Sequence, residues 1–123
     1  KSYHGLSHHG NNDESIGYLV TLEQYQIEQF GKFLTRLAGI PDGEQTLLDS
    51  TAVLFGSGMG NANSHTNSDL PIILAGGGYA TGEFRKVPSK GPGKVPLCNL
   101  FLDIAQKMGV EKDSFGTSTG RFS

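Results

Sequence analysis

The four histidines are the residues of this chain best suited to chemistry, and they fall in two short segments. His4, His8 and His9 lie within six residues of one another, and His65 ends a glycine-rich stretch. His4 and His8 are four residues apart, so a helix or a tight turn would present both imidazoles to one metal ion. His65 would be the third ligand, and catalytic zinc sites commonly use three protein ligands and leave one position for water or substrate. The alternative is that these histidines are exposed, or hydrogen-bonded within a loop, and hold no metal.

A glycine-rich segment, Gly56-Ser57-Gly58-Met59-Gly60-Asn61, directly follows an apolar run that is typical of a strand. Glycines permit close approach of the backbone and positive φ, and consecutive amides in such a loop can form a nest for an anion. Ser57 and Asn61 are the side chains that we expect to contact such a ligand. The segment lacks the GK[ST] sequence of a P-loop, so a plain tight loop is the alternative interpretation.

Two amphipathic helices are predicted on either side of this segment. Between about residues 15 and 38, apolar residues recur at the three-to-four spacing of one helix face. Asp13 is the expected N-cap, and Gly39 followed by Pro41 provides a stop residue and a helix breaker. Apolar residues within 96–108 form the second amphipathic face.

Two short apolar runs, at residues 51–55 and 70–74, predict buried strands. A third strand would come from a hairpin near residues 83–87. The order of helix, strand, glycine loop, strand, loop and helix is typical of an open α/β sheet, in which sites form at the carboxyl ends of strands. A sheet of two or three strands has exposed edges that tend to pair with another chain, so we expect a homodimer through a sheet edge.

Composition places the chain among globular domains of ordinary size. It has 123 residues, 36% hydrophobic residues and a net charge of -2 at pH 7, so one domain covering residues 1–123 is expected. A chain so close to neutral lacks the broad positive field that nucleic-acid binding usually requires. No apolar stretch approaches the roughly 20 residues that a membrane span needs. The single cysteine, Cys98, excludes an internal disulfide.

Several motifs together resemble a known bacterial family, the HXXSHH family of proteins of unknown function. The segment His4-Gly5-Leu6-Ser7-His8-His9 is similar to the motif for which that family is named. Nearly the whole chain is covered by further segments similar to the family's carboxyl-terminal region, namely Gly10-Asn11-Asn12, residues 54–60, Leu70-Pro71 with Ala75-Gly76-Gly77, residues 96–100, and Phe115-Gly116 with residues 118–121. The resemblance implies that the chain is the carboxyl-terminal part of a longer protein.

That family in turn resembles, more distantly, the alkaline phosphatase and sulfatase superfamily, whose members hydrolyse phosphate or sulfate esters with metals at the carboxyl ends of a central sheet. The likeness implies that this chain is a fragment of an alkaline-phosphatase-like open sheet. In the superfamily an Asp and a His four residues apart bind one metal, and His4 and His8 would take their places. A later His-Thr-x-Ser segment supplies another ligand, and residues 65–68 are similar to it. Gly58 and Met59 stand where the superfamily has an Asp-His pair for a second metal.

The residues and the resemblance together imply two candidate functions. The first is a metal-dependent phosphoester or sulfoester hydrolase, in which His4, His8 and His65 hold a divalent metal, with zinc expected, and His9 orients a ligand or transfers a proton. The resemblance places the nucleophile outside these 123 residues, so we expect this chain alone to be inactive. The second is a non-catalytic module on a degenerate hydrolase fold that binds a small anionic ester, a glycan or a partner protein. The resemblance also implies export to the periplasm or cell surface of bacteria.

Overall fold

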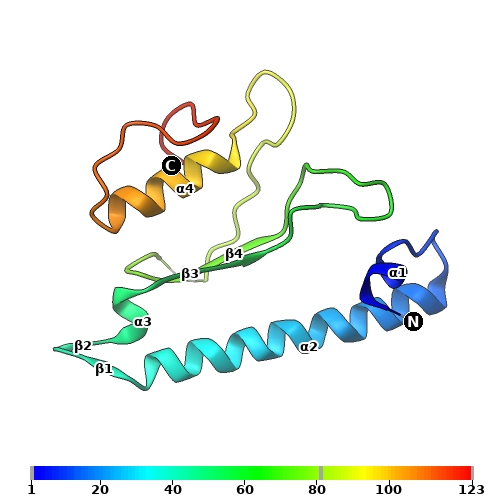
Figure 1. Cartoon of the computed structure of the whole chain (residues 1–123), viewed down its shortest axis with the longest axis horizontal. Coiled ribbons are helices and arrows are strands. Elements are labelled where there is room, and N and C mark those ends of the chain that lie inside the picture. Colours follow the sequence, from blue (N-terminus) through cyan, green and yellow to red (C-terminus); the bar gives the residue numbers. More distant parts are fainter. Residues whose placement is uncertain (1, 81, 123) are drawn as a thin grey trace. The chain divides into compact units, whose positions relative to one another are not determined.

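The residues that the structure describes form four helices and two small antiparallel sheets of two strands each. The structure is a computed structural model of the chain, and it describes residues 2–80 and 82–122. In chain order (Figure 1) the elements are α1 (Tyr3–Ser7), α2 (Asp13–Ala38), β1 (Pro41–Asp42), β2 (Gln45–Thr46), α3 (Leu47–Ser50), β3 (Ala52–Gly56), β4 (Ile72–Gly76) and α4 (Leu97–Lys107). The prediction of a mixed α/β fold with two main helices is confirmed. Within the described ranges, no helix is long and apolar enough to cross a membrane.

The chain divides into two compact units, Lys1–Gly82 and Glu83–Ser123. The first unit contains α1 to β4, and therefore all four histidines. The second contains α4 and the carboxyl-terminal segment. Every candidate site residue from the sequence thus belongs to the first unit.

The long helix α2 begins two residues earlier than its apolar spacing predicts. Asn12 is the N-cap in place of Asp13, because its side-chain oxygen accepts a 2.9 Å hydrogen bond from the backbone N–H of Ser15. Asp13 becomes the first helical residue, where its negative charge still interacts favourably with the amino end of the helix dipole. The predicted end is confirmed, since the backbone N–H of Gly39 donates to carbonyl groups of the last turn.

The strands β3 and β4 pair antiparallel, with Ala52 opposite Gly76 and Gly56 opposite Ile72. The carboxyl end of β3 therefore meets the amino end of β4, and residues 57–71 form the loop that connects them. In an open parallel sheet the carboxyl ends of neighbouring strands would meet, but that requires a crossover segment, usually a helix, which this connection does not contain. The hairpin considered near residues 83–87 does not form, because these residues have no regular secondary structure.

The β3–β4 sheet contacts α2 through an aromatic pair. Phe55 of β3 and Phe30 of α2 stack with their ring centroids 4.9 Å apart and an interplanar angle of 28°. Both strands are apolar on both faces, which is typical of strands covered on both sides. Leu54 and Ile73 are nevertheless 38% and 40% exposed. In the described part of the chain β3 and β4 pair only with each other, so the homodimer through a sheet edge stays a prediction.

A short hairpin, β1–β2, leads from α2 into α3 and then into the sheet. α3 begins with a capping box, in which Thr46 and Asp49 each bind the backbone N–H of the other. Its end lies close to β4 at Gly76, which has a φ of 70°. A Cβ at Gly76 would collide with the carbonyl oxygens of Leu48 and Thr51, so only glycine allows this approach.

The second unit is built around α4, which begins after the N-cap residue Pro96. Leu100 and Leu102 are 5% and 2% exposed, although two positions apart on a helix point in nearly opposite directions. The helix is therefore buried on two sides, which the pattern of one apolar face did not predict. Asn99 is also buried, and its side-chain oxygen accepts a 2.8 Å hydrogen bond from the backbone N–H of Thr119. This bond holds the carboxyl-terminal segment against the helix.

Candidate functional site

The first site segment is α1, which brings His4 and His8 together. Ser2 is its N-cap, and the Ser2 hydroxyl oxygen accepts a 3.1 Å hydrogen bond from the backbone N–H of Gly5. Leu6, which is 3% exposed, is the buried residue of the helix. His4 and His8 are about one turn apart, and their rings meet edge to face with centroids 4.9 Å apart.

The second site segment is the tip of the loop between β3 and β4, where His65 lies. Asn61 and Thr66 form an isolated antiparallel bridge, in which the Thr66 N–H donates to the Asn61 carbonyl oxygen at 3.1 Å. The side-chain oxygen of Asn61 accepts a second bond from the backbone N–H of Ser64 at 3.2 Å. His65 itself has a φ of 53°, in the left-handed region that few residues other than glycine adopt. Such conformations are held in place by the surrounding structure and occur often at functional sites.

The two segments meet at His8 and His65. Their Nε2 atoms are 3.2 Å apart and their ring centroids 4.8 Å apart. Two unprotonated nitrogens at this distance would repel each other, so the contact requires a shared proton or a shared cation. Two nitrogen ligands at the usual distance of about 2.0–2.1 Å from a tetrahedral zinc ion lie roughly 3.3 Å from each other. The spacing of this pair therefore fits both an N–H···N hydrogen bond and a common metal ion.

His4 is a neighbour of this pair but is not placed as its third ligand. Within residues 2–80 and 82–122, no group of three or more His, Cys, Asp or Glu side chains is arranged so that it could hold one metal ion. His4 contacts His8 through their rings, which meet edge to face at an interplanar angle of 68°. All three imidazoles are exposed, and exposed side chains change rotamer within nanoseconds. The structure thus brings the three predicted histidines together, with two of them at ligand spacing.

His9 is held by the turn that joins α1 to α2. Its Nδ1 accepts a 3.0 Å hydrogen bond from the backbone N–H of Asn11, and its carbonyl oxygen accepts one from the N–H of Asn12 at 2.9 Å. With Nδ1 engaged as an acceptor, a neutral His9 carries its proton on Nε2 and donates hydrogen bonds from there. The half-buried ring is therefore a positioned donor.

Ser57 and Asn61, the predicted ligand-binding side chains, take part in bonds within the loop itself. The Ser57 hydroxyl oxygen accepts a 3.1 Å hydrogen bond from the backbone N–H of Met59, and Asn61 binds Ser64 as described above. Local bonds of this kind shape turns. The hydroxyl hydrogen of Ser57 and the amide nitrogen of Asn61 are the atoms that ligand contact would use, and this role stays a prediction.

The glycine-rich segment differs in its backbone from the expectation of positive φ. Gly56, Gly58 and Gly60 are not among the residues with positive φ. A Cβ at Gly56 would collide with the Pro71 carbonyl oxygen, and one at Gly60 would collide with that of Ser68. Gly56 and Gly60 are thus required because the two sides of the loop approach each other closely at these positions.

Sequence reasoning missed Asn63, the residue that joins the two site segments. Its side-chain oxygen accepts a 3.0 Å hydrogen bond from the backbone N–H of Gly10. The bond links the turn after His9 to the loop that carries His65. Asparagine next to a glycine-rich loop was the only available signal, and it does not indicate a partner 53 residues away.

A phenol on α1 also contacts α2. The Tyr3 hydroxyl donates a 3.4 Å hydrogen bond to a carboxylate oxygen of Glu23. Partial burial raises the pKa of Tyr3, and the negative charge of Glu23 and this hydrogen bond raise it further. Tyr3 is thus kept as a neutral donor, which helps to hold α1 against α2.

No protein-family model, curated protein or solved structure matches the chain.

Proposed function

We propose that the chain is the carboxyl-terminal region of an HXXSHH-family protein and carries the metal-binding part of an alkaline-phosphatase-like hydrolase of phosphate or sulfate esters. The observation that carries this proposal is the 3.2 Å separation between Nε2 of His8 and Nε2 of His65. The two residues are 57 positions apart, and both belong to motifs that resemble metal-binding segments of that superfamily. Export to the periplasm or cell surface is part of the same proposal.

His8 and His65 are the proposed ligands from this chain, with His4 as the third. All three donors are imidazoles, which suit zinc, copper, nickel and iron better than magnesium or calcium. Zinc is the proposed metal, since a tetrahedral site fits the spacing of the His8 and His65 nitrogens. A divalent metal held there would polarise an oxygen of an anionic ester.

His9 is the proposed proton-transfer or orienting group. Its Nδ1 is occupied by the N–H of Asn11, so Nε2 is the atom that would donate to an ester oxygen or to a leaving group. Ser57 and Asn61 are the proposed contacts to the anion. The nucleophile belongs to a part of the protein outside this chain, so the chain by itself is proposed to be inactive.

The second proposed function is a binding module that retains the fold and has lost catalysis. It is favoured by Gly58 and Met59, which cannot ligate through the acid and imidazole groups that the superfamily has at these places. A protein of this kind would recognise a small anionic ester or a glycan without turnover.

Metal binding is tested on the chain itself, prepared without affinity-tag histidines. We expect about one zinc or cobalt ion per chain, with the cobalt absorption spectrum of a site of nitrogen ligands. His65→Ala should weaken binding by about tenfold or more, because it removes one ligand of the pair. His9→Ala is the matched control, since this neighbouring histidine is not a proposed ligand, and it should bind metal as the original chain does. Equal metal content in all three proteins, or no metal in any, would refute the metal site.

Hydrolysis is tested on the complete protein with aryl phosphate and aryl sulfate esters. Turnover that is lost in His65→Ala and reduced in His9→Ala supports the hydrolase. Metal binding and ligand binding without turnover would support the binding module in its place.

A further inference from the structure

A second, mostly apolar stripe runs along α2, beside the face that contacts Phe55 of the sheet. Its members recur at intervals of three and four residues: Tyr18, Leu22, Tyr25, Gln29, Phe33 and Arg36. At about 100° per residue, this stripe is centred roughly 90° around the helix from the face that holds Leu19, Phe30 and Leu37. It thus lies beside the face that holds these three residues and presents its aromatic side chains in another direction.

The stripe is well exposed. Tyr18 is 51% exposed, Tyr25 60% and Phe33 48%. Tyrosine and arginine are enriched in protein–protein interfaces, where they supply much of the binding energy. A stripe of three aromatic residues on one helix is therefore a candidate interface.

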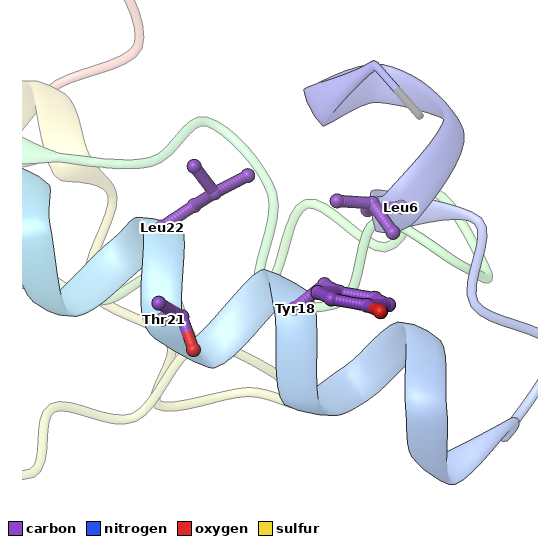
Figure 2. Close-up of a pocket in the computed structure, with 4 residues that line it drawn as sticks. All are labelled: Leu6, Tyr18, Thr21 and Leu22. Atoms are coloured by element: carbon purple, nitrogen blue, oxygen red, sulfur yellow. The ribbon is translucent and has the colours of Figure 1, made fainter.

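Near its amino end the stripe borders a groove. Leu6 of α1 and Tyr18, Thr21 and Leu22 of α2 line a largely apolar hollow of about 410 Å³ (Figure 2). In the close-up Leu6 lies over the ring of Tyr18, and Leu22 follows one turn further along α2. The groove is open on one side, and an aromatic side chain from a partner could enter it.

We propose that the stripe is the interface of a symmetric dimer, in which α2 packs antiparallel against α2 of a second copy with the two-fold axis near Tyr25. Glu14 continues the stripe one turn before Tyr18, so the stripe begins with an acidic residue and ends with the basic Arg36. Glu14 and Arg36 are each eleven residues from Tyr25. The two-fold axis therefore brings Glu14 of each copy to Arg36 of the other.

The same two-fold axis also places an aromatic side chain of the second copy at the groove. Tyr18 is seven residues before Tyr25, and Phe33 is eight residues after it. Phe33 of one copy thus lies one residue from the position opposite Tyr18 of the other, close enough for its ring to enter the groove beside Leu6. Charge pairing at the ends centres on Tyr25 and aromatic filling of the groove centres between residues 25 and 26, so the two agree to within one residue, which is the reason to assign the stripe to a second copy rather than to an unrelated protein. In such an isologous contact each feature occurs twice.

The charge pairs supply the sharpest test, by sedimentation of the 123-residue chain. Glu14→Arg places like charges opposite each other at both ends of the dimer, and Arg36→Glu does the same with the opposite sign. Each variant alone should dimerise about tenfold or more weakly than the original chain. An equimolar mixture of the two should recover dimers, because each substituted residue then faces an opposite charge. Circular dichroism of each variant checks that α2 remains helical.

The aromatic centre is tested with two matched substitutions on α2. Tyr25→Glu brings two carboxylates together at the two-fold axis and should abolish the dimer. Val20→Glu introduces the same charge on another face, at a residue that is 45% exposed, and should leave the dimer intact. The proposal would be overturned by any of three outcomes. The original chain could stay monomeric at a concentration of about 0.1 mM, the mixture of the two charge variants could fail to form dimers, or the dimer could survive Tyr25→Glu. The last of these outcomes would point to a sheet-edge dimer.

Discussion

The backbone N–H of Gly10 donates a 3.0 Å hydrogen bond to the side-chain oxygen of Asn63. Gly10 follows the histidine segment directly, and Asn63 is two residues before His65. The bond therefore links one histidine segment directly to the loop that carries the other.

Asn63→Ala should loosen this connection. Loss of one intramolecular hydrogen bond is expected to lower the free energy of unfolding by about 1 kcal/mol, and metal affinity should fall as well because His65 is no longer held near His8. Urea denaturation and zinc titration measure the two effects. Asn63→Asp keeps the acceptor oxygen, so it should behave much more like the original chain. If Asn63→Ala changed neither quantity, the bond would have no role in positioning His65.

The close approach at Gly60 predicts a difference between two glycines of one loop. A Cβ at Gly60 would collide with the backbone of Ser68, whereas one at Gly58 would have no heavy atom within 4 Å. Gly60→Ala should therefore destabilise the chain by roughly 1–3 kcal/mol, as overpacked sites do, and lower metal affinity. Gly58→Ala should change either quantity little. Similar thermal unfolding of both variants would contradict this packing of the loop.

The capping box of α3 predicts a pH dependence of stability. The hydroxyl of Thr46 donates to the Asp49 carboxylate at 2.7 Å and its backbone N–H at 2.8 Å, and these two bonds lower the pKa of Asp49. Because the folded-state pKa lies below the unfolded-state value, Asp49 adds stability at pH above the unfolded-state pKa of about 3.9. This contribution is lost as the pH falls through the folded-state pKa.

Asp49→Asn mimics the protonated carboxyl group and separates this effect from others. At pH 7 the original chain should be the more stable in urea denaturation. The difference should shrink steadily as the pH is lowered below about 4, because the two side chains then become alike in charge. A difference that is the same at pH 7 and pH 3 would show that the carboxylate charge does not matter.

The thiol of Cys98 should react at lower pH than an ordinary cysteine. The Thr117 hydroxyl and then the Thr117 backbone N–H donate hydrogen bonds that lower the pKa of Cys98. Since the thiolate is the reactive form, the midpoint of a pH profile of iodoacetamide alkylation should lie below that of a free cysteine. Thr117→Val should move the midpoint upward, and Thr117→Ser should restore it. An unchanged midpoint in Thr117→Val would rule out the hydroxyl as its cause.

Several features of the chain could be predicted from its sequence, because their causes are local. The three-to-four spacing of apolar residues indicated α2 and α4, and the apolar runs indicated β3 and β4. The stop at Gly39 was also predictable, whereas the N-cap was displaced by one residue, since Asn12 and Asp13 are both good caps. The clustering of His4, His8 and His9 needed only the order of residues.

Other features were decided by tertiary structure. The antiparallel pairing of β3 with β4, the meeting of His8 with His65, and the bond from Gly10 to Asn63 join residues that are far apart in the sequence. No local preference encodes such contacts, because they depend on how the loop packs against the turn between α1 and α2. Histidine spacing therefore identified the candidate ligands from the sequence. The 3.2 Å distance between Nε2 of His8 and Nε2 of His65 depends on tertiary structure, because the loop folds back toward α1. Backbone contacts and one asparagine side chain position His65 there.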